Sequence, residues 1–445
     1  MSTSSIEHAY QYPFASSVDN QRWVMAASCG PSLDEHTFFD GRLTRPDITA
    51  RLLLVLSQVV RTHFFDARPP QMDPIATSSP SMVRFEGFSG CCGVYARVDL
   101  DQRAFTQAAQ TFGTTNVDFN PSMIAHLARI SRTDDTSLAI TRDSVSIETG
   151  STKTVEKKVA LPKRWVKGLS EVQAYQSRLT RLHSFRPAAI APLLQSLARS
   201  GSGLQHLVVR GNSIRLSPRA QSGAMPIGGA ERLRVLSPLL SIADEISFWS
   251  DAASQTSAVT VDTLVGRLWL VLSPAMHRGF SGEGQVLAAL AENEWQAQVD
   301  DLYDLLGWQS QLDPAELAAR LGCRTEQVKA ALFALSTRGL AGFDAQSGYY
   351  FHRELPLDVD AIENDQPRLR AARKLLESDG VNVLRQDGEQ YDVQVTGSSI
   401  NQFVRLRPDG DRCSCIWFSR HQGQRGPCKH VLAARLKVDA KIPVL

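Results

Sequence analysis

The sequence predicts an α+β protein made of several domains, and three features indicate this architecture. First, its 445 residues are too many for one hydrophobic core, so about two to four domains are expected. Second, apolar and polar residues alternate through residues 137–162, as in paired strands, whereas residues 48–61 are apolar on nearly all sides, as in a buried helix. Third, compact patterns at residues 313–351 and 413–430 predict two small modules after this mixed region.

The first two predicted domains are mixed α+β regions at residues 1–170 and 171–298. In the first, Asp47 is expected to cap the helix that follows it, and residues 102–112 are expected to form a short helix. In the second, residues 206–217 have the pattern of a strand, a turn and a second strand. Both regions should therefore combine sheets with helices.

No catalytic motif occurs in these two regions. The glycine-rich loop at residues 278–284 lacks the lysine and hydroxyl of a phosphate-binding loop, and the chain has neither a Gly-x-Ser-x-Gly elbow nor a His-Glu-x-x-His helix. Cys91 and Cys92 are expected to be buried small residues, because adjacent cysteines seldom bridge comfortably. We therefore expect a protein that is not an enzyme, with scattered catalytic residues in residues 1–290 as the alternative.

Composition and charge indicate an ordinary globular protein of a reducing compartment. No segment reaches the roughly eighteen apolar residues of a membrane helix, and the first residues lack the apolar run of a signal peptide. No membrane contact is therefore expected. Seven cysteines, an odd number, are typical of a cytoplasmic protein. The net charge of +2 gives no overall case for nucleic acid, but residues 401–445 carry nine Lys and Arg against three Asp and Glu.

Residues 299–356 predict a module of two helices and a hairpin. Asp313 and Pro314 begin the first helix, and Gly322 ends it. The second helix carries one apolar stripe, made of Val328, Leu332 and Leu335. A strand, a turn and a strand follow, and this order resembles a winged helix-turn-helix.

The basic residues of this module are few for a DNA reader. Arg324 and Lys329 lie on the second helix beside Glu326, whereas a dedicated DNA-binding helix carries a denser basic stripe. Since the fold alone does not imply DNA binding, protein docking is favoured over sequence-specific DNA binding. The acidic segment at residues 358–366 is expected to link this module to the next.

The last predicted domain, residues 367–445, contains three cysteines and a histidine at metal-ligand spacing. They follow the order Cys-x-Cys, twelve residues, Cys-x-His, and are Cys413, Cys415, Cys428 and His430. A tetrahedral zinc site prefers thiolate and imidazole donors, and three cysteines cannot pair evenly in disulfides. We therefore predict one structural Zn²⁺ held by these four residues, with His421 as a weaker fifth candidate.

Residues 390–438 resemble the SWIM zinc finger. The signature of that family is Cys-x-Cys, a variable gap and Cys-x-His, and all four positions are filled here. Strand-like residues 391–395 and 404–406 precede the ligands, as in the family. The resemblance implies a zinc-binding module that contacts DNA or proteins.

Several earlier segments resemble bacterial proteins that contain a SWIM zinc finger. These segments are Phe39–Pro46, Val83–Ser89, Cys92–Asp99, Gly113–Asn120, Leu161–Gly168 and Arg278–Gly284. This wider resemblance implies association with MoxR-type AAA ATPases and von Willebrand A proteins.

Two functions follow from these patterns. We expect a zinc-binding cytoplasmic adaptor that docks protein partners through its last two modules, and the alternative is a DNA-binding regulator that uses the same modules. Trp417 and Phe418 either stack on bases or cover the core of the zinc module, and the second interpretation is favoured. The basic residues around them are Arg405, Arg407, Arg412, Arg420, Arg425 and Lys429.

Overall fold

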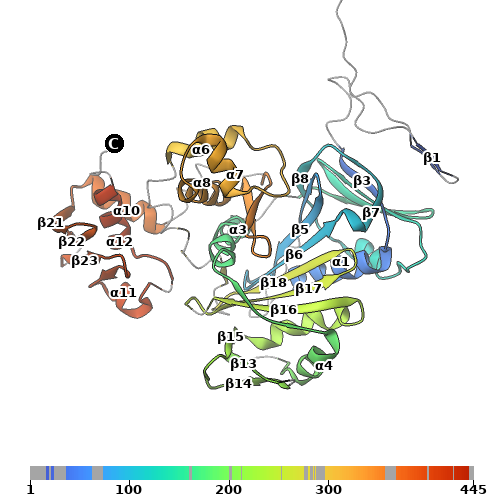
Figure 1. The fold of residues 1–445 in the computed structure, drawn as a ribbon, viewed down its shortest axis with the longest axis horizontal. Helices are drawn as coiled ribbons and strands as arrows, with labels where there is room; N and C mark the ends of the chain where they lie inside the picture. The colour runs from blue at the N-terminus through green and yellow to red at the C-terminus, as the bar shows by residue number, and fades with distance from the viewer. Residues whose placement is uncertain are drawn as a thin grey trace, which may run out of the picture.

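The computed structural model shows antiparallel sheets and helices in a mixed α/β arrangement of several parts (Figure 1). It describes residues 17–19, 22–24, 37–62, 74–159, 163–199, 203–211, 213–251, 253–274, 279–280, 284, 286, 296–355, 367–397, 400–423 and 425–439. The predicted linker at residues 358–366 lies outside these residues, and so does most of the loop at 278–284. No helix of the described ranges is both long and apolar enough to cross a membrane.

Eight antiparallel strands form the central sheet. Their order is β12 (Thr180–Phe185), β16 (Ala243–Asp251), β17 (Thr256–Thr263), β18 (Gly266–Leu272), β6 (Val94–Asp101), β5 (Met82–Phe88), β4 (Ile75–Ser79) and β8 (Gly113–Asn116). The pairing of β6 with β18 joins strands from the predicted regions 1–170 and 171–298 in one sheet. One hydrophobic core also spans both regions. The predicted boundary at residue 170 therefore does not coincide with a break in the sheet or in the core.

Helix α1 (Pro46–Arg61) packs against the central sheet, in agreement with its apolar sequence. Asp47 was expected at the cap, but Arg45 holds that position because Pro46 is the first helical residue. Asp47 lies in the first turn, where its carboxylate accepts hydrogen bonds from the Arg45 guanidinium at 2.8 and 2.9 Å. The prediction of the helix is thus confirmed, whereas the predicted cap is wrong.

A second sheet has five strands, and its strand β11 packs against α2 (Pro121–Leu127), which in turn packs on α1. Its order is β11 (Thr152–Lys157), β10 (Ser144–Thr149), β9 (Thr136–Thr141), β3 (Thr37–Leu43) and β7 (Phe105–Gln110). Residues 102–112 do not form the expected helix, since only 102–104 make a short 3-10 turn before β7. The ring of Phe105 lies 4.6 Å from that of Phe39, and β7 pairs with β3, so tertiary packing decides the conformation.

A small three-stranded sheet, with order β14 (Ser213–Ser217), β13 (Leu204–Arg210) and β15 (Met225–Gly228), confirms the strand pair expected at 206–217. Its strand β14 packs against α4 (Pro187–Ser196), which packs in turn on the 3-10 segment η2 (Ala230–Leu239). The buried Arg232 guanidinium donates hydrogen bonds to the carbonyls of Gly93 at 2.6 Å and Ser273 at 2.9 Å. Arg232 thereby attaches this sheet to the ends of β6 and β18.

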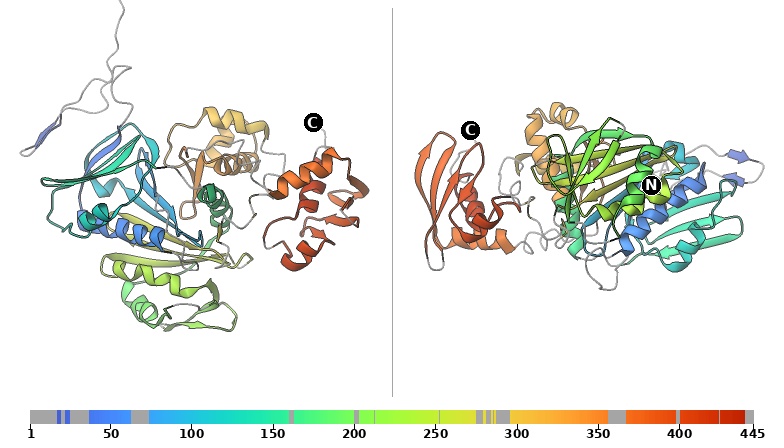
Figure 2. Two further views of the ribbon diagram at one scale, coloured as in Figure 1. Left: turned by 180° about the vertical axis from the view of Figure 1, so that it is seen from behind. Right: turned by 90° about the horizontal axis from the view of Figure 1, so that it is seen from below.

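The predicted helix pair and hairpin are present as α7 (Pro314–Leu321), α8 (Thr325–Thr337), β19 (Ala341–Asp344) and β20 (Tyr349–His352), with α6 (Gln296–Asp304) packed on α8. Asp313 caps α7 by accepting a hydrogen bond from the Ala315 N–H at 2.8 Å, as expected. Gly322 ends the helix with a φ of 65°, a left-handed conformation that favours glycine. Helix α3 (Lys163–Gln176) lies between this module and the central sheet (Figure 2).

The last module contains a four-stranded antiparallel sheet and three helices. The strands are β21 (Val381–Asp387), β22 (Gln390–Val395), β23 (Gln402–Leu406) and β24 (Arg412–Cys413), and the helices are α10 (Pro367–Glu377), α11 (Ile416–His421) and α12 (Lys429–Asp439). Helices α10 and α12 pack together, and α12 covers one face of the sheet. The hydrophobic core of this last module is separate from the core of the central sheet.

Candidate metal centre

The four predicted ligands come from three adjacent elements of the last module. Cys413 ends β24, and Cys415 is the cap residue of α11. Cys428 directly precedes α12, and His430 lies in the first turn of that helix. The structure brings together the four side chains that the sequence spacing singled out, and their candidate ligand atoms lie within 4.8 Å of one another.

The geometry and burial of this cluster suit one zinc ion. In a tetrahedral site with Zn–S bonds of about 2.3 Å, neighbouring ligand atoms are roughly 3.7 Å apart. The Sγ of Cys413 already lies 3.9 Å from the Nδ1 of His430. All four residues are buried, so the cluster is shielded from solvent. Because the protein supplies all four ligands, the site is closed and suited to a structural role.

The starts of two helices favour negative charge on the thiols. The Phe418 N–H at the start of α11 donates to the Sγ of Cys415 at 3.4 Å, and the Val431 N–H of α12 donates to the Sγ of Cys428 at 3.5 Å. A hydrogen bond from Cys413, with smaller contributions from His430 and Val431, lowers the pKa of Cys428 to about 4. Thiolates are the form that binds zinc, and the two helix starts stabilise this form at Cys415 and Cys428.

The loop before Cys428 is held by a residue that the sequence did not single out. The Arg368 guanidinium, on α10, donates hydrogen bonds to the carbonyls of Arg425 at 2.8 Å and Pro427 at 3.0 Å. It also lies 4.9 Å from the ring of Trp417. Arg368 therefore positions the second pair of ligands from outside the cluster. No ligand spacing points to it, because it lies about 60 residues earlier in the chain.

The aromatic residues near the site contribute to its packing. Trp417 and Phe418 are both half-buried and pack against the core of the zinc module. This arrangement agrees with the favoured interpretation, in which they cover that core. His421 does not belong to the four-residue cluster, and its ring lies 4.8 Å from that of Trp417.

The remaining described cysteines form no second centre. Cys92 is buried, as expected, whereas Cys91 is half-buried with its Sγ 3.4 Å from the hydroxyl of Ser89. Cys323 is also half-buried and lies in the helix-pair module. Within the described ranges, the only cluster of three or more possible metal ligands is the one at residues 413–430.

A buried group of charges joins the helix-pair module to the central sheet, and sequence reasoning missed it. Arg353 donates to both oxygens of Glu86 at 2.5 and 2.6 Å, and both side chains are fully buried. Burial alone would raise the pKa of Glu86, but the charge of Arg353 and the hydrogen bonds from Arg353 and Tyr95 together outweigh burial, and the pKa lies below its usual value. On the same strand pair, Arg97 bridges Asp99 at 2.8 Å and Asp344 at 2.7 Å. The hairpin is thus fixed to the sheet by ion pairs that are shielded from water.

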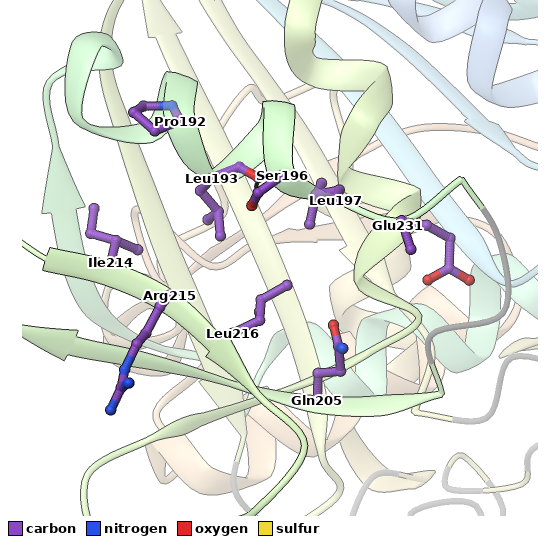
Figure 3. A pocket seen from close by; sticks show the side chains of 10 residues that line it. Pro192, Leu193, Ser196, Leu197, Gln205, Ile214, Arg215, Leu216 and Glu231 are labelled. Carbon is purple, nitrogen blue, oxygen red and sulfur yellow. Dashed lines mark hydrogen bonds between the residues drawn. The ribbon is translucent and has the colours of Figure 1, made fainter.

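A cavity of about 500 Å³ lies between α4 and the small sheet (Figure 3). Its size is within the range of small-molecule sites. Leu193, Leu197 and Leu216 give it an apolar lining, while Arg215 points away from α4. The lining residues bring together no set of groups suited to catalysis or metal binding, so we assign no function to the cavity.

The cluster and its sheet-and-helix scaffold define a zinc finger of the structural kind. Comparison with family models gives a more specific result, since the model of the SWIM zinc finger matches residues 391–438, which contain all four cluster residues. This chain therefore carries a SWIM zinc finger, as its sequence indicated. No curated protein matches the chain.

Among solved structures, the chain is similar to the proliferating cellular nuclear antigen of Entamoeba histolytica. The sequences are 10% identical, and the match covers 54% of this chain and 99% of the other, with a TM-score of 0.38. A score of this size supports no argument about fold or function.

Proposed function

We propose that this protein is a zinc-dependent cytoplasmic adaptor that docks other proteins and has no enzymatic activity of its own. The observation that carries this proposal is the burial of the helix pair and hairpin against the rest of the chain. A winged helix-turn-helix that reads DNA needs a free second helix, because that helix enters the major groove. In this protein the equivalent helix is α8.

Helix α8 is buried over its second half, partly in the module's own core and partly against α3. Its residues Ala331, Leu332 and 334–337 are buried, and the hydroxyl of Ser170 on α3 donates to the carbonyl of Thr337 at 2.9 Å. The basic residue Lys329 stays exposed in the first half, next to the exposed Glu326. This surface is small and carries little net charge, which favours a structural or protein-docking role for the module.

The hairpin of β19 and β20 also contacts the rest of the chain. The N–H of Phe343 donates to the side-chain oxygen of Gln173 on α3 at 2.5 Å, and Arg97 of the central sheet donates to the carbonyl of Phe343 at 2.8 Å. In a winged helix the hairpin is the wing that contacts the DNA backbone. In this protein the hairpin contacts α3 and the central sheet instead. This supports the proposal that the module has a structural role within an adaptor.

The zinc module is then the part that is free to dock partners. The resemblance of residues 39–284 to bacterial SWIM-containing proteins makes MoxR-type ATPases and von Willebrand A proteins the first partners to test. Purified proteins of both kinds would be titrated with the full chain and with the Cys428→Ser/His430→Ala variant. Binding that needs the intact zinc cluster supports the proposal, and failure to bind either protein contradicts this choice of partners.

The alternative is a DNA-binding regulator, and one observation favours it. Basic residues outnumber acidic ones nine to three in residues 401–445, and Arg405, Arg412, Arg420 and Lys429 are exposed. The full chain would be titrated with single-stranded and duplex DNA across a salt series. Binding weaker than about 10⁻⁴ M near physiological salt is below ordinary non-specific affinity and removes this alternative. Strong, salt-sensitive binding would replace the adaptor proposal by this one.

A further inference from the structure

One face of the zinc-module sheet is uncovered. Val381, Val393, Val404 and Cys413 face the buried side, where α12 packs on the strands. Figures 1 and 2 show α10 and α12 on this side, and no described element on the other. We call the uncovered side, formed by residues that alternate with the buried ones, the outer face.

The outer face carries two arginines side by side. Arg405 of β23 is directly opposite Arg412 of β24, and on its other side it is opposite Asp392 of β22. The Asp392 carboxylate accepts a hydrogen bond from Arg407 at 2.5 Å, so the nearest acidic group is already engaged. Neither Arg405 nor Arg412 forms an ion pair with any residue that the structure describes. Like charges directly opposite each other are unfavourable, and an acidic partner would relieve this.

Exposed apolar side chains occur on the outer face and beside it. Phe403 is two residues before Arg405 and therefore on the same face, and it is 54% exposed. Leu384, 56% exposed, is the extra residue of a bulge in β21, next to Arg385, which is opposite Asp392. Ile416, 72% exposed, begins α11 two residues after Ser414, whose N–H donates to the carbonyl of Phe403 at 3.0 Å. Exposed apolar groups gathered in this way mark interaction surfaces.

We propose that the outer face docks a segment of a partner protein that presents apolar side chains flanked by Asp or Glu. This inference rests on the proposed adaptor function and identifies the surface and the chemistry of the partner. Arg405 and Arg412 require acidic groups, while Phe403, Leu384 and Ile416 require apolar ones. Nucleic acid would satisfy the arginines and could stack on Phe403, but the aliphatic Leu384 and Ile416 offer no flat face on which bases stack. A protein segment satisfies both requirements.

The test uses the full, zinc-loaded chain as bait for a displayed library of short random peptides, with a thymidine homopolymer as the nucleic-acid probe. We expect the selected peptides to combine acidic with aromatic or aliphatic residues. Arg405→Glu/Arg412→Glu and Phe403→Ser should each weaken their binding by about tenfold or more. The charge-reversed variant should in turn select peptides with Lys in place of the acidic residues.

The control is Arg215→Glu/Arg219→Glu, which changes the net charge by the same amount on two exposed residues, one on β14 of a different sheet and one just after that strand. It should bind the selected peptides like the unaltered chain. Zinc content is measured for every variant, and if Phe403→Ser loses zinc, the arginine variant alone decides. Peptides that bind all variants equally, or no selected peptide at all, would overturn the inference.

A different outcome is that the chain binds the homopolymer but no peptide, and that Arg405→Glu/Arg412→Glu abolishes this binding. That result would assign the outer face to nucleic acid instead. If partner docking depends on zinc but not on these residues, the adaptor function stands and this inference fails.

Discussion

Cys428 and His430 should determine whether the protein holds metal. Replacing Cys428 by Ser and His430 by Ala removes one thiol and the imidazole, which leaves two ligands where a stable structural site needs four. We expect the zinc content of the purified protein to fall from about one equivalent to near zero. Metal analysis after dialysis measures this directly.

The matched control is His421→Ala, which removes the histidine that lies outside the cluster. It should keep its zinc. Stoichiometric zinc in the double variant, or its loss in the control, would show that the ligand set is different.

Glu156 should make stability depend on pH. Its carboxylate accepts a hydrogen bond from the Asn120 side-chain amide at 2.8 Å, and burial raises its pKa from 4.5 to about 7. A carboxyl whose pKa is higher in the folded state stabilises the fold at low pH, and this stabilisation is lost as the pH rises through 7. Glu156→Gln does not titrate, so its Tm relative to the unaltered protein should increase between pH 5 and pH 8. A difference that stays constant over this range would contradict the assignment.

The residues of the metal centre were predictable because their signal is local. The spacing of Cys413, Cys415, Cys428 and His430 needs only the chemistry of zinc ligands and a short stretch of chain. Arg368 was not predictable in this way, since one arginine on an amphipathic helix is indistinguishable in sequence from a solvated one. Its role depends on how α10 packs against the loop before Cys428.

The hairpin of β19 and β20 should lose stability when its buried charges are unbalanced. Glu86→Gln leaves the Arg353 guanidinium buried without its counter-charge, and breaking such a pair typically costs about 3–5 kcal/mol. The double variant Glu86→Gln/Arg353→Met removes both charges and should recover much of that loss. Urea unfolding of the two variants and of Arg353→Met alone measures the coupling. Additive losses would show that the two residues act independently.

The positions of strands were easier to predict than whether a given face of a strand is buried or exposed to solvent. Arg84, Glu86, Arg97 and Asp99 occupy alternate positions of β5 and β6, a pattern that usually marks a solvent-exposed face. In this structure the hairpin covers that face, and the polar side chains pair with Asp344 and Arg353. The alternation identifies the strands, but the hairpin that buries this face lies roughly 250 residues further along the chain.

Removal of zinc should lower the stability of the zinc module much more than the stability of the central sheet. The core of the zinc module is distinct from that of the central sheet, and metal binding contributes directly to the folding free energy of such small modules. In calorimetry, a strong chelator should abolish or lower the transition of residues 381–439 and leave the main transition within a few degrees of its original temperature. A single transition that shifts as a whole would show that the parts unfold together.

The pairing of β6 with β18 also bears on how the chain is made. These strands are roughly 170 residues apart, so at about 5–20 residues per second the ribosome needs roughly ten to thirty seconds to deliver β18 after β6. During that interval β6, with its apolar residues, has an unpaired edge that other chains can join. Until residue 272 emerges, this edge of the central sheet is therefore where misassembly during synthesis would begin.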